Sequence, residues 1–390
     1  MEFAMMRFLI PLIIVVAITM CGCSRQGNVQ ASGGDADVQQ VQLRELQLLK
    51  LPPGFQIGLF ASSLTRPRMM ALSPDGRLFL TEMGAGRVTI LPDTNGDGRT
   101  DRHIVYASGL RQPHGIVFHG GYLYIAETNR VIRYPYRNGD SSSPRPQIVV
   151  PNLPSGAGHS TRTITFGSDG KLYVSVGSSC NVCIESNPLR AAITRYNADG
   201  SGRQVIATGL RNSVGLAWNP STNQLWATDN GRDYLGDNLP PEEVNVIRPG
   251  GFYGWPYAYG NRVPDPDFGR RAPDKVRATI PPKIAIQAHS APLGLAFYTG
   301  NMFPPEYRGD LFIAYHGSWN RSTPTGYKVV RFNIQNGNVV GTQQNFITGW
   351  LQGRSDWGRP VDLLVGRFGE LYITDDSGGR VYRVTYRAPN

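Results

Sequence analysis

Four of the six histidines stand in polar loops beside short apolar segments, in the company of several arginines. An imidazole titrates near neutral pH and can take a proton from a substrate, and the planar guanidinium group binds carboxylates. If these groups converge, they form a site for proton transfer on a polar or anionic ligand. The four histidines are His114, His159, His289 and His316. The polar loops are 66–68, 112–114, 159–162, 211–212, 229–233, 289–290, 316–321, 359–360 and 375–376.

The segments between these loops repeat one pattern, in which two strand-like apolar runs are joined by a tight turn. In one copy, Thr163-Ile-Thr-Phe166 and Leu172-Tyr-Val-Ser-Val176 flank a Ser-Asp-Gly turn, and Gly170 supplies the positive φ that closes a hairpin. The copies lie at 70–82, 115–127, 163–176, 215–229, 294–314 and 362–375, and most are followed by a third strand-like run. Six copies of a unit too small to bury its own face predict an all-β chain folded as a six-bladed β-propeller.

A fourth kind of strand-like run lies ahead of the hairpins, at 102–110, 146–150, 203–210 and 344–348. These runs are the expected outer strands of the preceding blades. The run Phe55–Ala61 has the same place but no blade ahead of it. We expect it to pair beside the third strand of the last blade, near Val381, which would remove two exposed sheet edges.

The propeller topology predicts where the polar loops lie. The first strand of each blade lines the central channel, so the loop before it and the loop after the second strand lie at one face. The histidines and arginines are therefore expected to meet around the mouth of the channel, which is the default place for a binding site.

Composition narrows the class of partner. The 390 residues carry a formal net charge of +10, and 40% of them are apolar, enough to bury a large core. The sequence has no basic runs with interleaved aromatic residues, so we expect no nucleic-acid partner. The excess of basic residues has two open interpretations, an arginine-rich soluble surface and a site for a small anion.

The N-terminus has the pattern of an export signal. Arg7 precedes an apolar run from Phe8 to Met20 that is too short to span a bilayer comfortably. The run ends in Met20-Cys-Gly-Cys23, which resembles a bacterial lipoprotein signal, with a plain secretory signal as the alternative. We expect a lipoprotein-type signal peptide at 1–23, a flexible tether at 24–46 and a propeller domain at 47–390. The expected location is the periplasm or outer cell surface, with membrane contact only through a lipid on Cys23.

Two cysteines, Cys180 and Cys183, remain in the expected exported domain. A Cys-x-x-Cys pair can be a redox centre, half of a zinc site or a local disulfide. The expected propeller domain has no second cysteine pair to complete a zinc site, and an exported protein meets oxidising surroundings. We therefore predict a structural disulfide that fixes the loop after Val176.

The chain resembles the quinoprotein sugar dehydrogenases, within them the soluble aldose and L-sorbosone dehydrogenases. The likeness covers nearly all of residues 50–388 and is carried by Gly209-Leu-Arg-Asn-Ser-Val-Gly-Leu-Ala-Trp218, Glu242-Glu-Val-Asn-Val-Ile-Arg-Pro-Gly-Gly-Phe-Tyr-Gly-Trp-Pro256, Gly158-His-Ser-Thr-Arg162 and Gly358-Arg-Pro-Val-Asp362. The resemblance implies a six-bladed propeller that holds pyrroloquinoline quinone and Ca²⁺. It also implies oxidation of an aldose or sorbosone-like sugar by hydride transfer, with a quinone or small redox protein as the electron acceptor.

The resemblance assigns expected roles by position. His159 corresponds to the general base that takes the proton of the sugar hydroxyl. The residues expected to bind the quinone are Gln112, Arg162, Arg211, Asn212, His316 and Arg359. The main-chain carbonyls of Gly231 and Arg232 correspond to ligands of the calcium beside the quinone. Glu243 and the carbonyl of Tyr253 correspond to a second, structural calcium site.

Several positions depart from the glucose-oxidising members. Those members have an aspartate just before the histidine and another after the following strand, where this chain has Gly158 and Ser178. They also have a second arginine where this chain has Val361. Their lysine in the loop after the second strand of the fifth blade has no clear counterpart, and the nearest residues are His316, Asn320 and Arg321. These departures leave the substrate and the tuning of His159 open.

Two other functions are alternatives to the dehydrogenase. A calcium-dependent propeller lactonase or other hydrolase would centre its metal on acidic and asparagine side chains in the channel, whereas these loops are mainly arginine and histidine. A non-catalytic cell-surface binding propeller would need no catalytic set, and the missing carboxylates beside His159 are what decay to such a module would produce.

Residues Asp93-Thr-Asn-Gly-Asp-Gly-Arg-Thr-Asp101 match the first nine positions of a calcium-binding loop. Ile104 stands where an EF-hand has its bidentate glutamate. A turn between two strands explains the same residues as well as a weak calcium site does, so both interpretations stay open.

Overall fold

The structure, a computed structural model, describes residues 44–388. The expected signal peptide, Cys23 and most of the expected tether lie outside these residues. Residues 44–48 are helical, Glu45 forms an ion pair with Arg380, and Leu46 packs against the core. Within the described residues, no helix has the length and apolar character needed to cross a membrane.

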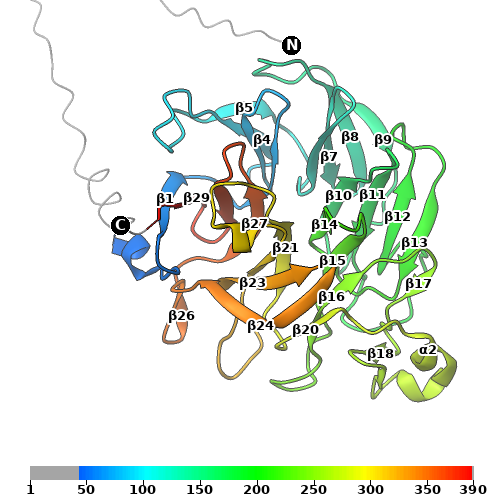
Figure 1. Ribbon diagram of the computed structural model, residues 1–390. Coiled ribbons are helices and arrows are strands. Elements are labelled where there is room, and N and C mark those ends of the chain that lie inside the picture. The colour runs from blue at the N-terminus through cyan, green and yellow to red at the C-terminus, as the bar shows by residue number, and fades with distance from the viewer. Residues whose placement is uncertain (1–43, 389–390) are drawn as a thin grey trace, which may run out of the picture. The chain divides into compact units, whose positions relative to one another are not determined.

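Six antiparallel blades follow one another around a central axis, as Figure 1 shows. Blade 1 contains β2 (Pro67–Leu72), β3 (Leu78–Glu82), β4 (Arg87–Leu91) and β5 (Ile104–Ala107). Blade 2 contains β6 (Ile116–His119), β7 (Tyr122–Glu127), β8 (Arg130–Pro135) and β9 (Gln147–Val150). Blade 3 contains β10 (Arg162–Phe166), β11 (Leu172–Val176), β12 (Ala192–Tyr196) and β13 (Gln204–Thr208), with β17 (Gly251–Phe252) parallel at its edge.

The remaining blades have the same order from the axis outward. Blade 4 contains β14 (Leu216–Trp218), β15 (Leu225–Asp229), β16 (Glu242–Val246) and β20 (Ile284–Ile286). Blade 5 contains β21 (Pro292–Phe297), β22 (Leu311–Tyr315), β23 (Lys328–Gln335) and β24 (Asn338–Ile347). Blade 6 contains β27 (Pro360–Val365), β28 (Leu371–Asp375), β29 (Arg380–Tyr386) and β1 (Phe55–Ala61). The predicted six-bladed, all-β propeller is confirmed.

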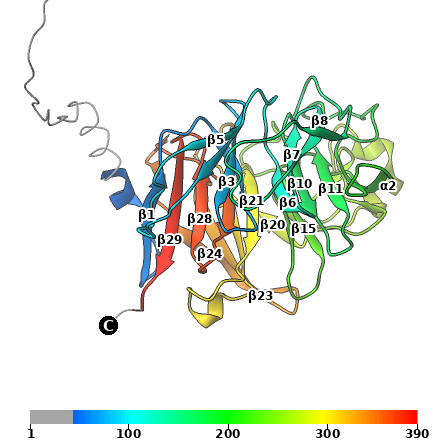
Figure 2. The same cartoon turned by 90° about the horizontal axis from the view of Figure 1, so that it is seen from above.

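The N-terminal strand closes the ring. Strand β1 pairs antiparallel with β29, with Phe55 opposite Tyr386 and Ala61 opposite Val381. Figure 2 shows the blue β1 beside the red β29. The predicted pairing near Val381 is confirmed. The last blade therefore takes its outer strand from the start of the propeller, and its third strand is not left as an open edge.

Alternation along the strands makes a separate apolar core between each pair of neighbouring blades. In β7, Leu123 and Ile125 pack toward blade 1, whereas Tyr124 and Ala126 pack toward blade 3. Successive side chains of a strand point to opposite faces of the sheet, so a fully buried blade reads as a continuous apolar run. The blades are stacked by these cores, which leaves the loops at their ends for function.

Several short elements lie outside the four-stranded sheets of the blades. They are the two-stranded pairs β18 (Ala258–Tyr259) with β19 (Val263–Pro264) and β25 (Leu351–Gln352) with β26 (Ser355–Asp356), the 3₁₀ turns η1 (Gly269–Arg271) and η2 (Pro305–Tyr307), and helix α2 (Pro273–Ala278). In the loop 93–101, the Asp93 carboxylate accepts hydrogen bonds from the backbone N–H groups of Gly96 and Gly98, at 2.9 and 3.0 Å. This geometry is that of a self-bonded turn.

Candidate active site

A polar cavity of about 180 Å³ lies where loops of blades 3, 4 and 5 meet. Most of its walls come from loops before the first strand of a blade, called leading loops here, and from loops after the second strand, called trailing loops, and Glu242 adds the start of β16. The lining residues are His159, Arg211, Asn212, Asn230, Gly231, Asp233, Glu242, His289, Ala291, Trp319 and Asn320. The convergence predicted from the repeat is therefore present for these three blades.

A repeated carboxylate fixes the leading loops. In four blades the second strand ends in a buried Glu or Asp whose oxygens accept hydrogen bonds from the backbone N–H groups of the leading loop of the same blade. The pairs are Glu82 with Thr65, Glu127 with Arg111, Asp229 with Arg211 and Asn212, and Asp375 with Arg359, at 2.5–3.0 Å. Two of the arginines expected at the site, Arg211 and Arg359, are thus held at the backbone by the end of the second strand of their own blade.

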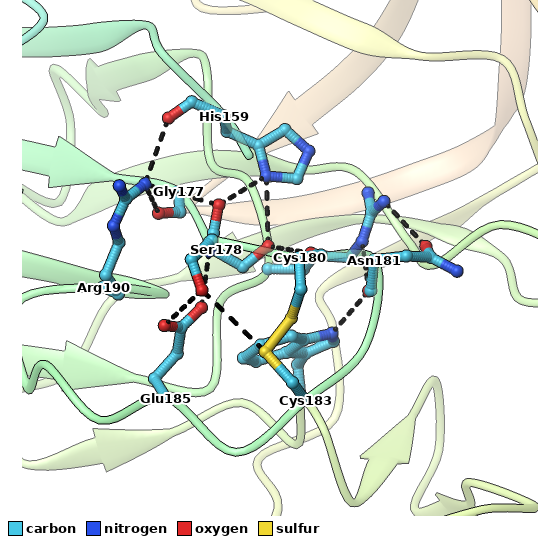
Figure 3. The surroundings of a disulfide bond; sticks show 11 residues. His159, Gly177, Ser178, Cys180, Asn181, Cys183, Glu185 and Arg190 are labelled. Carbon is cyan, nitrogen blue, oxygen red and sulfur yellow. Dashed lines mark hydrogen bonds between the residues drawn. A yellow bond between two sulfur atoms is a disulfide. The ribbon is translucent and has the colours of Figure 1, made fainter. Parts of the chain in front are cut away.

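The side chain of His159 is oriented by Ser178 (Figure 3). Its Nδ1 lies 3.1 Å from both the carbonyl oxygen and the Oγ of Ser178, and that Oγ donates its own proton to the carbonyl of Cys180 at 2.6 Å. Both Ser178 atoms are therefore acceptors, which places the proton on Nδ1 and leaves a lone pair on Nε2. Burial and, second, the neighbouring Arg211 lower the pKa of His159 to about 4. The imidazole is neutral at neutral pH.

Gly158, beside this histidine, has a steric reason to be glycine. Its φ is +81°, and a Cβ added there would lie 2.4 Å from the carbonyl oxygen of Ser178. The chain approaches the Ser178 loop too closely for an aspartate in this backbone conformation.

The predicted disulfide between Cys180 and Cys183 is confirmed (Figure 3). The loop that it closes places Asn181 against Arg211. The Arg211 side chain donates from Nε to the Asn181 carbonyl and from one terminal nitrogen to Asn181 Oδ1, both at 2.9 Å. The same nitrogen contacts Asp233 at 3.0 Å. Asn181 Oδ1 also accepts the backbone N–H of Asp233 at 2.8 Å. The disulfide loop therefore sets the position of the guanidinium group.

A second, smaller cavity of about 20 Å³ brings the four residues predicted to hold calcium to one place. Gly231, Arg232, Glu243 and Tyr253 all line it, although the sequence assigned them to two sites, and Gly231 also lines the larger cavity. A space of this size holds one water-sized particle. Burial raises the pKa of Glu243 to about 7, although the amide of Asn245 donates to it at 3.0 Å. The Oδ1 atom of Asn245 is buried without a hydrogen-bond partner in the described residues.

The other residues expected at the quinone lie outside the lining of the larger cavity. Gln112 is exposed, and its Oε1 accepts a hydrogen bond from Thr128 at 3.1 Å. Arg162 is fully buried and donates to carbonyl oxygens of its own loop, including that of His159 at 2.8 Å. Burial lowers the pKa of Arg162 to about 9. These contacts give Gln112 and Arg162 roles in the loops themselves.

His316 and Arg359 belong to a neighbouring cluster. His316 Nε2 lies 2.8 Å from Asp376, which also pairs with Arg68 at 2.5 Å. The guanidinium of Arg359 donates to the carbonyl oxygens of His316 and Gly317, at 3.0 and 2.6 Å. Of the four histidines predicted to converge, only His159 and His289 line the cavity among the described residues. His316 belongs to the neighbouring cluster, and His114 contacts it through Arg68, at 3.3 Å.

The sequence matches the profile of the TrAA12-like family over residues 49–253 and 273–387. The chain belongs to the TrAA12-like family. An uncharacterised protein of Borreliella burgdorferi is 35% identical to it over 87% of this chain and 91% of that protein. A pyrroloquinoline quinone-dependent sugar dehydrogenase of Hypocrea jecorina is 26% identical over 90% of this chain and 93% of that protein.

Solved structures share the fold of this TrAA12-like chain. The calcium structure of Trichoderma reesei Carbohydrate-Active Enzymes Family AA12 has a TM-score of 0.75 at 24% identity and covers 87% of this chain and 97% of that one. The holo form of the quinone-binding domain of Coprinopsis cinerea pyranose dehydrogenase has a TM-score of 0.74 at 22% identity, with 86% and 97% covered. The resemblance to quinoprotein sugar dehydrogenases is confirmed.

Sequence reasoning missed three residues that shape the site of this TrAA12-like chain. Asn181 lies between two cysteines for which the sequence predicted only a structural disulfide. Asp233 and Trp319 stood in loops that were predicted to reach the mouth, but their own contacts were not predicted. An asparagine inside a tight covalent loop and a tryptophan inside a polar loop are the signals that could have pointed to them.

Proposed function

We propose that this TrAA12-like chain is a quinoprotein dehydrogenase that oxidises an aldose or sorbosone-like sugar by hydride transfer to pyrroloquinoline quinone. The observation that carries the proposal is the state of His159, which lies in the wall of a cavity that Arg211 and Asn212 also line. Ser178 engages its Nδ1 proton, and its Nε2 has no hydrogen-bond partner among residues 44–388. The quinone-dependent sugar dehydrogenase of Hypocrea jecorina, aligned over 90% of this chain, supports the same reaction class.

The side chains at the mouth suit a planar ligand that carries carboxylates. Arg211 and Asn212 line the cavity, and the Nε of Arg68 and the Oγ of Ser290 are buried without hydrogen-bond partners in the described residues. Buried polar groups of this kind need a partner. We assign quinone binding to Arg211 and Asn212, with Arg359 and His316 in the neighbouring cluster. Gln112 is left out because it is exposed and outside the cavity lining, and Arg162 because it is fully buried outside that lining.

His159 would act as the general base. When bound, the quinone supplies the acceptor for the hydride. The substrate hydroxyl would donate to Nε2 of His159 and pass its proton there as the hydride leaves the same carbon. The low pKa of His159 keeps Nε2 unprotonated at neutral pH, so no proton has to be removed before the substrate binds. In the same walls, Asn230 donates from Nδ2 to the carbonyls of Asn212 and Pro292, at 3.3 and 2.9 Å, and its Oδ1 would accept a hydrogen bond from another hydroxyl of the sugar.

Calcium fits the smaller cavity. The buried carboxylate of Glu243 lines this cavity together with the acidic residues Asp229 and Asp265, and Ca²⁺ prefers oxygen ligands. We propose that Ca²⁺ binds there through Glu243 and the carbonyls of Gly231, Arg232 and Tyr253. The divalent charge would offset the burial that otherwise disfavours the ionised Glu243.

Reconstitution tests the proposal and separates it from its two rivals. The purified chain is loaded with the quinone and CaCl₂, and bleaching of a redox dye is followed after addition of a panel of aldoses. Sugar-dependent bleaching supports the dehydrogenase. Quinone-independent hydrolysis of a lactone would favour the calcium hydrolase, and sugar binding without either reaction would favour the binding propeller. His119, whose ring stacks on Phe166 at 3.8 Å, gives a matched control for His159, so His119→Ala should leave bleaching unchanged.

We further propose that the chain is exported, anchored through a lipid on Cys23, and reoxidised by a quinone or small redox protein outside the cytoplasm. The support is the sequence pattern of residues 1–23 alone. In cells, the wild-type chain should partition into the detergent phase and carry a fatty-acyl label, and Cys23→Ser should lose both. A Cys23→Ser chain that still carries the label would reject the anchor.

A further inference from the structure

Two large aromatic side chains stand in water at the mouth of the polar cavity. Trp319 is 67% exposed and Tyr234 is 74% exposed. Trp319 follows β22 of blade 5 and Tyr234 follows β15 of blade 4, and their rings meet edge to face with centroids 6.1 Å apart. Trp319 also lines the cavity. Two exposed aromatic rings in contact at the rim of a polar cavity form an apolar surface that a ligand in the cavity can cover.

The backbone that carries the indole is fixed to the neighbouring blade. Directly after Trp319, the amide of Asn320 donates to Asp233 Oδ1 at 2.6 Å. Arg321 then donates from Nε to the carbonyl of Asp237 at 2.9 Å. The two trailing loops are therefore clamped together beside the ring. A rigid aromatic surface binds a ligand at a lower cost in conformational entropy than a mobile one.

The rest of the cavity has the opposite character. Its walls carry the polar side chains of His159, Asn212, Asn230, Asp233 and Glu242. A ligand that fills it must present polar groups to these walls and an apolar surface to the indole. Closed-ring sugars have this two-sided chemistry, because their hydroxyl groups project from the rim of the ring and their C–H bonds form apolar faces. Open-chain aldehydes have the polar groups but lack the flat apolar face.

We propose that Trp319, backed by Tyr234, is a stacking platform that binds the face of a closed-ring sugar and selects ring sugars as the substrate class. This inference rests on the proposed dehydrogenase function and deepens it. The indole offers neither an acid nor a base to the substrate. It therefore contributes to binding and not to proton transfer, and its removal changes KM much more than kcat.

Kinetics of the loaded enzyme give the first test. Trp319→Ala should raise KM for ring sugars such as D-glucose and D-xylose about tenfold, the factor that corresponds to about 1.4 kcal/mol, with kcat nearly unchanged. Trp319→Phe should keep part of the affinity. The small aldehyde glycolaldehyde should be oxidised equally well by all three proteins. Phe368 is 71% exposed in the turn between β27 and β28, at the opposite end of the blades, and Phe368→Ala is the matched control. Equal effects of Trp319→Ala on glucose and glycolaldehyde would overturn the proposal.

A binding measurement separates this inference from the proposed function. Methyl α-D-glucopyranoside has a blocked anomeric carbon, and its binding is followed by saturation-transfer NMR. Its ring C–H protons should receive saturation from the wild-type chain and from Phe368→Ala, and lose it in Trp319→Ala. If wild type oxidises no sugar but shows this Trp319-dependent transfer, the dehydrogenase assignment is wrong and the platform stands. If wild type oxidises sugars and the transfer is the same in Trp319→Ala, the platform is wrong.

Discussion

The disulfide between Cys180 and Cys183 is predicted to control the affinity for the quinone as well as the stability of the fold. It closes a loop of four residues, numbers 180–183, that holds Asn181 against Arg211. The perturbation is the double variant Cys180→Ser with Cys183→Ser, which opens the loop and leaves every other side chain in place. Reduction of the wild-type chain should reproduce its effects reversibly.

The two expected magnitudes come from different contacts. Closing so short a loop restricts the unfolded chain by about 6 cal/mol/K, so opening it should lower the free energy of unfolding by about 2 kcal/mol at 25 °C. Arg211 would also lose the fixed partner of two hydrogen bonds and retain Asp233 and the Asn230 carbonyl. A hydrogen bond to a charged group is worth about 1.5–3 kcal/mol, and partial loss of one should weaken quinone binding about tenfold.

The assays are urea unfolding for stability and fluorescence titration for the quinone. Asn181→Ala with the disulfide intact should lose similar affinity, because it removes the Oδ1 acceptor of Arg211. Asn338→Ala is the matched control, since Asn338 is exposed and contacts Lys283 at 2.7 Å, far from the site. If the double variant is less stable but binds the quinone as wild type does, the disulfide only stabilises the fold. The claim that its loop positions Arg211 for the quinone is then refuted. The native wild-type chain, without its signal, should show no reactive thiol.

The further predictions concern three residues of the site, His159, Arg211 and Glu243. His159→Ala should still bind quinone and Ca²⁺, but its quinone reduction in stopped flow should be about 10²–10⁴ times slower, and an unchanged rate would make His159 structural. The pKa of His159 is about 4 in the folded chain, compared with about 6.5 in the unfolded chain. Wild-type kcat/KM should therefore be constant from about pH 8 to 5 and fall as the pH drops through about 4. The stability contributed by neutral His159 should be full above about pH 6.5 and be lost as pH falls toward 4, a loss that His159→Gln should remove in urea titrations. Arg211→Ala leaves Asp233 without its arginine and should weaken quinone affinity about a hundredfold in titrations, so an unchanged affinity would place the ligand elsewhere. Glu243→Gln should abolish the rise in melting temperature that Ca²⁺ gives the wild-type chain after chelation, and an equal rise in both would reject the smaller cavity as the calcium site.

The sequence determined the architecture of this protein because its signals are local. Apolar runs of strand length, turns closed by glycine and a sixfold repeat are properties of short segments, and they predict six blades without knowledge of any distant contact. Ring closure followed from one strand, Phe55–Ala61, that had no blade of its own. Even the carboxylates that fix the leading loops, such as Asp229 and Asp375, recur at one position of the repeat and are visible in the sequence.

Only the tertiary structure decided which polar groups act together. Arg162 follows His159 by three residues in sequence, yet its guanidinium is engaged by carbonyls of its own loop, because the loop folds back over a buried side chain that has to satisfy its donors. Ser178 orients His159 where an aspartate was missing, which depends on a main-chain approach that Gly158 permits. The pairing of Trp319 with Tyr234 joins two blades. Such contacts depend on how the loops of separate blades meet in space, and spacing along the chain does not encode that geometry.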